Sequence, residues 1–195
     1  GRRNDRFSAE IVDLHTDILV WARCLRRPHT QKKKIPRTSL TCLARFRQAT
    51  STWRLLTADR LREQMVLVRG FHGDGFTLLT GIEVDILEDG ALDQDPELLD
   101  ELDVVVASAH SKLRMDRGPM TRRLVAAVSD ARVDVLGHVT GRLVEGSRGT
   151  RPPSQFDPRA VFEACAEHGT AVEINSRPER RDPPTRAYLG LGFFF

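Results

Sequence analysis

Cysteine is scarce in this chain, and long apolar runs are lacking. The three cysteines, Cys24, Cys42 and Cys165, are odd in number and form no CxxC pair. This pattern argues against a disulfide scaffold or a zinc ribbon and fits a reducing cytoplasm. No apolar run approaches the roughly 18 residues of a membrane span, and no secretory signal opens the chain. We therefore expect a cytoplasmic protein without a membrane partner.

The size and the balance of residue types are those of a globular protein. Of the 195 residues, 40% are hydrophobic and 29% are charged, as is usual for globular domains. The length allows one domain with a sizeable core, but it falls short of the roughly 250 residues of a complete (β/α)8 barrel. Because the first residue is Gly and not Met, we expect the chain to be part of a longer protein.

Positive charge is concentrated in residues 17–56. This window holds ten of the 30 Lys and Arg residues but only one of the 27 acidic residues, Asp17, so its net charge is +9 and that of the remainder is −6. Both tryptophans and two of the three cysteines also lie there, and the window shows no sustained helical or alternating pattern. We hypothesise that residues 17–55 are translated from a displaced reading frame, and the tail after Arg186 from a second one.

Short apolar runs in this sequence end on residues that can hold a metal or a phosphate. They are followed by Glu83, His110, His138 and Asn175, and a fifth run precedes His15. Such runs, with helical stretches between them, are typical of parallel strands in an α/β barrel, whose strand C-termini carry the chemistry. We expect strands over 9–15, 76–82, 103–109, 133–137 and 170–174, and helices over 57–70, 96–102, from Pro119 onward, and over 158–168.

Glu83, His110 and His138 form the leading candidate site, a metal centre. Imidazole and carboxylate groups hold Zn²⁺ and Mn²⁺, and such ions activate water as a nucleophile. A lone histidine is more often a packing or capping residue. Three histidines at equivalent strand ends, His15, His110 and His138, reverse that balance. Asp85 lies on the same side of its strand as Glu83, where it is either a further polar group of the site or a partner for a loop.

Five segments resemble the PHP (polymerase and histidinol phosphatase) family, above all the PHP module of bacterial family X DNA polymerases and stand-alone PHP phosphoesterases. They are DLHT at 13–16, TGIEVDIL at 80–87, DVVVASAHS at 103–111, VDVLGHVTGR at 133–142 and AVEINSRPERRD at 171–182. The resemblance implies an α/β fold, a distorted (β/α)7 TIM-like barrel, with two or three divalent ions at its C-terminal rim. It also implies hydrolysis of phosphate esters, including histidinol phosphate and DNA 3′ ends.

The resemblance also implies roles for individual residues. His15 corresponds to the first His of the family's HxH motif, and Asp17 stands where the second His is expected. Glu83 corresponds to the carboxylate shared by two ions, with His110 and His138 as further ligands. Glu173 and Asn175 line the site, while Arg142 and Arg177 are placed to meet substrate phosphate.

The sequence departs from the family pattern in three places. Asp17 replaces a histidine, no TDH motif precedes residues 56–59, and the later Asp-x-His motif is not in the chain. One metal site therefore has all its expected ligands, another is partial, and a third lacks them. We interpret residues 1–195 as a single PHP-like domain, family-like at 9–16 and 57–184, with an atypical insert at 17–56, an atypical tail at 185–195 and an incomplete C-terminal side.

Three functional hypotheses follow. The first is a metal-dependent phosphoesterase whose partner is a phosphate ester such as a DNA 3′ end. The second is a catalytically impaired PHP remnant that binds Zn²⁺ or Mn²⁺ without turnover. The third is a nucleic-acid-binding module that uses the basic window 17–56, with its lysines at 32–34. It is the weakest hypothesis because no interleaved aromatic residues support strand binding.

Overall fold

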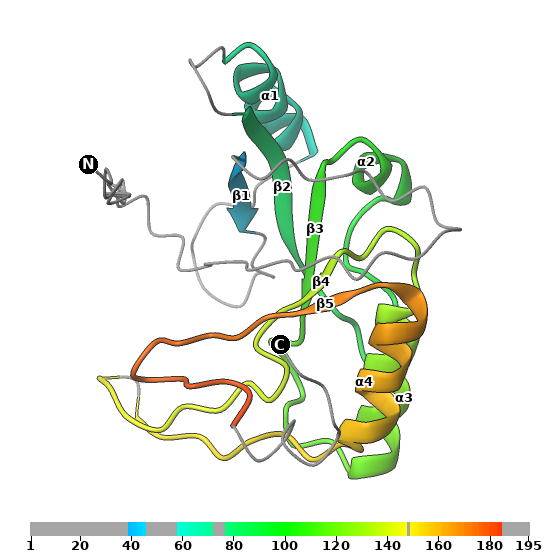
Figure 1. The fold of residues 1–195 in the computed structure, drawn as a ribbon, viewed down its shortest axis with the longest axis vertical. Helices are drawn as coiled ribbons and strands as arrows, with labels where there is room; N and C mark the ends of the chain where they lie inside the picture. Colours follow the sequence, from blue (N-terminus) through cyan, green and yellow to red (C-terminus); the bar gives the residue numbers. More distant parts are fainter. Residues whose placement is uncertain (1–38, 46–57, 72–76, 148, 185–195) are drawn as a thin grey trace, which may run out of the picture.

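The computed structural model describes residues 39–45, 58–71, 77–147 and 149–184 (Figure 1). Strands and helices alternate along this part of the chain. In order they are β1 (Ser39–Arg45), α1 (Ala58–Arg69), β2 (Thr77–Asp85), α2 (Pro96–Asp100), β3 (Val104–Ser108), α3 (Arg117–Val128), β4 (Val135–Leu136), α4 (Pro158–His168) and β5 (Ala171–Val172). None of the described helices is long and apolar enough to cross a membrane.

The five strands form one parallel sheet in which spatial order follows chain order, β1-β2-β3-β4-β5. One helix connects each strand to the next. This sequential order is that of a (β/α) barrel and differs from the reversal at the centre of doubly wound sheets. The α/β class is confirmed, and the sheet is compatible with part of a TIM-like barrel.

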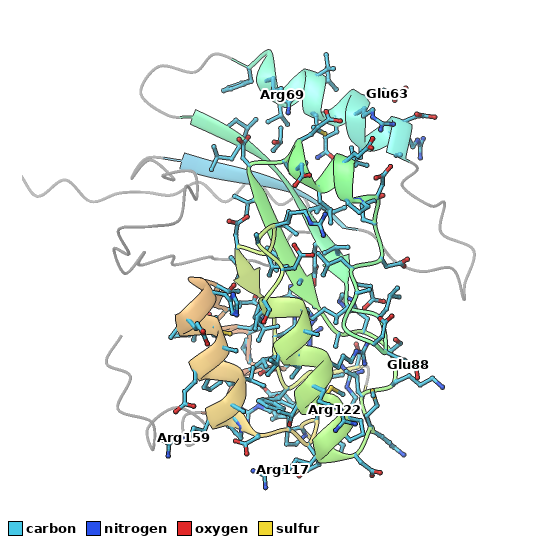
Figure 2. The ribbon with its side chains drawn as sticks, turned by 90° about the vertical axis from the view of Figure 1, so that its right-hand side faces the viewer. Glu63, Arg69, Glu88, Arg117, Arg122 and Arg159 are labelled. Carbon is cyan, nitrogen blue, oxygen red and sulfur yellow. The ribbon has the colours of Figure 1, made fainter. Side chains whose placement is uncertain are left out.

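Both faces of the sheet are apolar, as parallel sheets require. Alternate strand residues, among them Ile82, Val105 and Leu136, join the main core with the buried sides of the helices. The residues between them form a smaller apolar cluster on the opposite face, made by Leu79, Val104, Val106 and Val135. Figure 2 shows α3 and α4 side by side on the main-core face, with the charged side chains of Arg117, Arg122 and Arg159 directed outward.

The helix ends show why these segments fold as predicted. In α4, the Asp157 side chain accepts from the backbone N–H groups of Arg159 and Ala160, Pro158 opens the first turn, and Gly169 ends the helix at φ 70°. These are the expected cap, first-turn and stop residues. The predicted inward residues of α1, Leu61, Met65 and Val68, are all buried.

Several boundaries differ from the prediction. The basic window contains a strand, β1, because residues 39–44 form an uncharged run between Arg37 and Arg45 that the charge of the whole window conceals. Helix α3 begins at Arg117, two residues before Pro119, since proline is tolerated throughout a first turn whose N–H groups lack helical acceptors. β2 continues to Asp85, so that Glu83 lies inside the strand. The predicted strand at 9–15 lies outside the described residues.

Candidate metal centre

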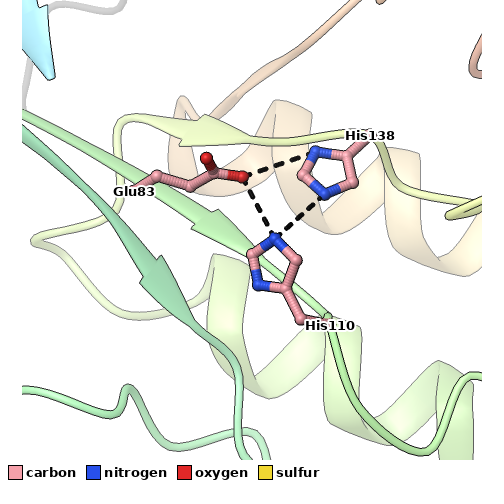
Figure 3. Close-up of side chains that lie close together, drawn as sticks. All are labelled: Glu83, His110 and His138. Carbon is pink, nitrogen blue, oxygen red and sulfur yellow. Dashed lines mark hydrogen bonds and ion pairs between the residues drawn. The ribbon is translucent and has the colours of Figure 1, made fainter. Parts of the chain in front are cut away.

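Glu83, His110 and His138 come from three neighbouring strands and converge on one point (Figure 3). The Nε2 atoms of the two imidazoles are 3.3 Å apart. Glu83 Oε1 lies 3.3 Å from His110 Nε2 and 3.7 Å from His138 Nδ1. One potential ligand atom from each residue lies within 4.8 Å of the others, so the sequence correctly placed the three side chains together.

The period-two geometry of the strands explains the convergence of Glu83 and His110. Glu83 follows Leu79 by four residues in β2, and His110 follows Val106 by four residues along the continuation of β3. Side chains at even spacing lie on the same side of a strand. The site therefore continues the smaller apolar face of the sheet at its C-terminal edge. Glu83 and His138 are buried there, whereas the His110 side chain remains 34% exposed and gives solvent access.

Gly137 lets strand β4 approach β3 next to His138. A Cβ atom at Gly137 would collide with Ser108 Oγ and lie 3.0 Å from Val106 Cγ1. His138 itself has a positive φ of 22°, an uncommon backbone conformation for a residue with a side chain. Such conformations persist where surrounding contacts impose them. The chain thus bends sharply where it delivers this imidazole.

Each imidazole is contacted by one further carboxylate, which also accepts its backbone N–H. Asp85 Oδ1 accepts the backbone N–H of His110 at 3.0 Å and lies 3.3 Å from its Nδ1. Glu173 Oε2 accepts the backbone N–H of His138 at 2.5 Å and lies 3.4 Å from its Nδ1. A proton on His110 Nδ1 satisfies Asp85 and leaves the Nε2 lone pair directed toward Glu83 and His138. In His138, Nδ1 lies between Glu173 Oε2 and Glu83 Oε1, at 3.4 and 3.7 Å. Carboxylates in this position orient histidine ligands and increase their basicity.

The electrostatics of the centre favour a cation. Burial opposes protonation of His110, but the hydrogen bonds from its ring to Asp85 and Glu83 and the charges of both carboxylates outweigh it, raising the pKa of His110 to about 9. Two nitrogen lone pairs and a carboxylate oxygen so close together repel one another unless a proton or a metal lies between them. The site therefore attracts positive charge.

The donor set fits Zn²⁺ or Mn²⁺. Tetrahedral ligation with metal–nitrogen distances of about 2.0–2.1 Å separates neighbouring ligand atoms by about 3.3–3.4 Å. The His110–His138 and Glu83–His110 separations are both 3.3 Å, and Glu83 Oε1 lies 3.7 Å from His138 Nδ1. Two imidazoles and one carboxylate are also the ligands that these ions share.

The residues predicted to line the site or meet substrate, Arg142, Asn175 and Arg177, either belong to the 175–182 segment or contact it. Asn175 is buried, and its Nδ2 donates to Glu173 Oε1 at 3.1 Å. Arg142 donates from Nε to the Arg180 carbonyl at 2.9 Å and from Nη2 to the Arg181 carbonyl, so its guanidinium holds this segment. Arg177 is exposed, and its backbone N–H donates to Asn175 Oδ1 at 3.3 Å. His15 and Asp17 lie outside the described residues.

Sequence reasoning missed the structural part played by Asp182. Its side chain is completely buried, Oδ1 accepts the Thr140 N–H at 3.1 Å, and its backbone pairs with Asn175 in both directions. Burial raises the pKa of this carboxyl group above its ordinary value. A single Asp in the charged segment ERRD offers no pattern that distinguishes it from an exposed residue. Asp182 returns the chain to the site after the 177–181 turn.

Comparison with known proteins gives three informative relatives. DNA polymerase/3'-5' exonuclease PolX of Bacillus subtilis is 36% identical over 129 residues, 65% of this chain and 22% of the relative. "Probable phosphatase PBPRB2022" of Photobacterium profundum is 31% identical over 116 residues, 58% of this chain and 42% of the relative. "Probable phosphatase YcdX" of Escherichia coli is 30% identical over 106 residues, 53% of this chain and 39% of the relative.

These relatives are PHP-family proteins. The predicted resemblance to the PHP family is confirmed. The chain spans less than half the length of each of these three relatives, and no family model matches it. Because these matches cover only part of each relative, the activity of the longer proteins is not assigned to this chain by similarity alone.

Proposed function

We propose that this chain is a PHP-type phosphoesterase that hydrolyses a phosphate monoester or a DNA 3′ end with a divalent ion held by Glu83, His110 and His138. The convergence of two carboxylate-backed imidazoles on one buried glutamate carries the proposal. The names of the relatives, a polymerase with exonuclease activity and two phosphatases, support the substrate class.

Bound at this centre, Zn²⁺ or Mn²⁺ supplies a Lewis acid that activates water and offsets charge on a phosphoryl group. The protein contributes the fixed geometry. Asp85 and Glu173 hold the Nδ1 sides of the imidazoles, and the exposed side of His110 leaves a path for substrate. In this proposal Arg177 meets substrate phosphate, and Arg142, which donates to the carbonyls of Arg180 and Arg181, holds the segment that bears Arg177.

We also propose that the sheet belongs to a distorted (β/α)7 barrel made by a single domain. The sequential strand order and the second apolar face support this, because in a barrel that face is the packed interior. In such a barrel, His15 and Asp17 would come from a neighbouring strand and hold part of a further ion.

Metal analysis of the purified chain, combined with phosphatase and 3′-exonuclease assays in Mn²⁺ and in Zn²⁺, tests the proposal. We expect bound metal and turnover, both lost in His110→Ala and both kept in His168→Ala. His168 ends α4 just before β5 begins. It therefore lies toward the N-terminal ends of the strands, whereas the site lies at their C-terminal ends. Bound metal without turnover would support the impaired remnant, and absence of metal in the wild type would contradict both hypotheses.

A further inference from the structure

Arg123 is the largest fully buried side chain in the part of the chain that the structure describes, with 1% of its surface exposed. It lies in α3 among the apolar residues Met120, Leu124 and Ala127. A buried guanidinium is costly unless hydrogen bonds satisfy its donors. Its partners therefore indicate why the helix has an arginine on its inward face.

The guanidinium donates to main-chain carbonyls of two separate loops. Nε donates to Leu87 O at 2.8 Å, and Nη2 donates to Ile86 O. Nη1 donates to Ser111 O at 2.9 Å and lies 3.6 Å from Met115 Sδ. The rigid fork of one arginine thereby joins the loop after β2 to the loop after β3.

Both loops are connected directly to the Asp85–His110 pair. Ile86 directly follows Asp85, and Ser111 directly follows His110. Asp85 and His110 also contact each other through the backbone N–H and the ring of His110. The Asp85–His110 pair is thus connected twice, once by its own hydrogen bonds and once through Arg123.

The loop after β2 packs closely against α3 next to Arg123. A Cβ atom at Gly90, whose φ is 93°, would lie 2.6 Å from Ala126 Cβ and 2.7 Å from Arg123 O. Burial lowers the pKa of Arg123, and the charges of Asp85, Glu88 and Asp89 oppose this shift. The loop therefore supplies a close backbone contact and two of these carboxylates, Glu88 and Asp89, which favour the charged guanidinium.

The geometry points to Arg123 as a positioning residue that fixes the loops after β2 and β3 and so sets the placement of His110 against Asp85 and Glu83. This inference rests on the proposed function for its consequence, which is tight metal binding. The positioning itself can be measured without metal.

The test compares Arg123→Lys and Arg123→Met with Arg122→Lys and Arg122→Met, which change the same residue type at the exposed neighbouring position of α3. Hydrogen exchange is followed in metal-free protein at the His110 N–H, with the His138 N–H as internal reference because its acceptor, Glu173, lies outside both loops. Zn²⁺ affinity is then measured by competition with a chelator under conditions where each variant is folded.

In both Arg123 variants we expect the His110 N–H to exchange roughly tenfold faster or more, with little change at His138. We also expect Zn²⁺ affinity to fall roughly tenfold or more, as for other groups that orient ligands. The Arg122 variants should match the wild type. Unchanged His110 exchange in folded Arg123 variants, or equal acceleration at His110 and His138, would overturn the inference.

The two proposals fail in distinguishable ways. Faster His110 exchange in a protein whose wild type binds no Zn²⁺ would leave the positioning intact and end the metal hypothesis. Unchanged exchange with tight Zn²⁺ binding would do the reverse. If the Arg123 variants do not fold, native-state exchange of the wild type in urea decides: we expect the 86–87 and 110–111 amides to open together, and separate opening free energies would overturn the inference.

Discussion

The Nε2 atoms of His110 and His138 lie 3.3 Å apart although 28 residues separate them in the chain. Neighbouring parallel strands, β3 and β4, end on the same side of the sheet and bring them there. Two imidazoles with carboxylates at their other nitrogens form a cation site with a preset direction. The following predictions depend on that arrangement.

Glu83→Gln should remove the ligand carboxylate of the proposed centre without changing its size. We expect Zn²⁺ affinity to fall by roughly 100-fold or more, beyond the typical cost of losing a group that orients a ligand. Isothermal titration calorimetry measures this. Glu97→Gln, on the exposed side of α2, is the matched control, and equal affinities for the two variants would contradict the assignment of Glu83.

Glu173→Gln should weaken metal binding less than Glu83→Gln does. The amide keeps the shape of the side chain but loses the charge that favours the proton on His138 Nδ1. We expect a loss of about 10- to 100-fold in Zn²⁺ affinity, with no comparable loss in Glu167→Gln on α4. A Glu173→Gln variant with wild-type affinity would show that this carboxylate only supports the backbone.

The stability of the metal-free protein should fall as pH rises from about 6.5 to about 9. The pKa of His110 is raised from 6.5 to about 9 in the folded state, so its contribution is complete below the unfolded value and is lost through the folded value. Metal binding near pH 7 should correspondingly release a proton. Urea unfolding in EDTA measures the first effect, and a His110→Gln variant with the same pH dependence would rule out His110 as its source.

Gly137→Ala should destabilise the protein by about 1–3 kcal/mol, the usual cost of overpacking. The added methyl group would collide with Ser108 Oγ and crowd Val106. Thermal unfolding should show a lower midpoint, partly restored in the double variant Gly137→Ala/Ser108→Ala. Gly118→Ala is the control because its Cβ atom would lie 3.6 Å from its nearest neighbour; comparable destabilisation there would contradict the steric explanation.

The strand-and-helix order and the three converging side chains could be predicted because they depend on local patterns. Short apolar runs that are followed by a polar residue identify the strands. Asp157, Pro158 and Gly169 mark the ends of α4. Arg123 could not be predicted as buried, since its cost is offset by carbonyls 12 to 37 residues away. For Asp85, the sequence left two readings open, and the contact with His110 in the folded chain distinguishes them.

A zinc-soaked crystal of the purified chain, with anomalous data at the zinc edge, tests the central claim most directly. We expect an anomalous peak within about 2.3 Å of Glu83 Oε1, His110 Nε2 and one ring nitrogen of His138, given the usual zinc–nitrogen and zinc–oxygen distances. If a crystal saturated with zinc shows no anomalous peak near these three atoms, or shows peaks only elsewhere, the account is contradicted.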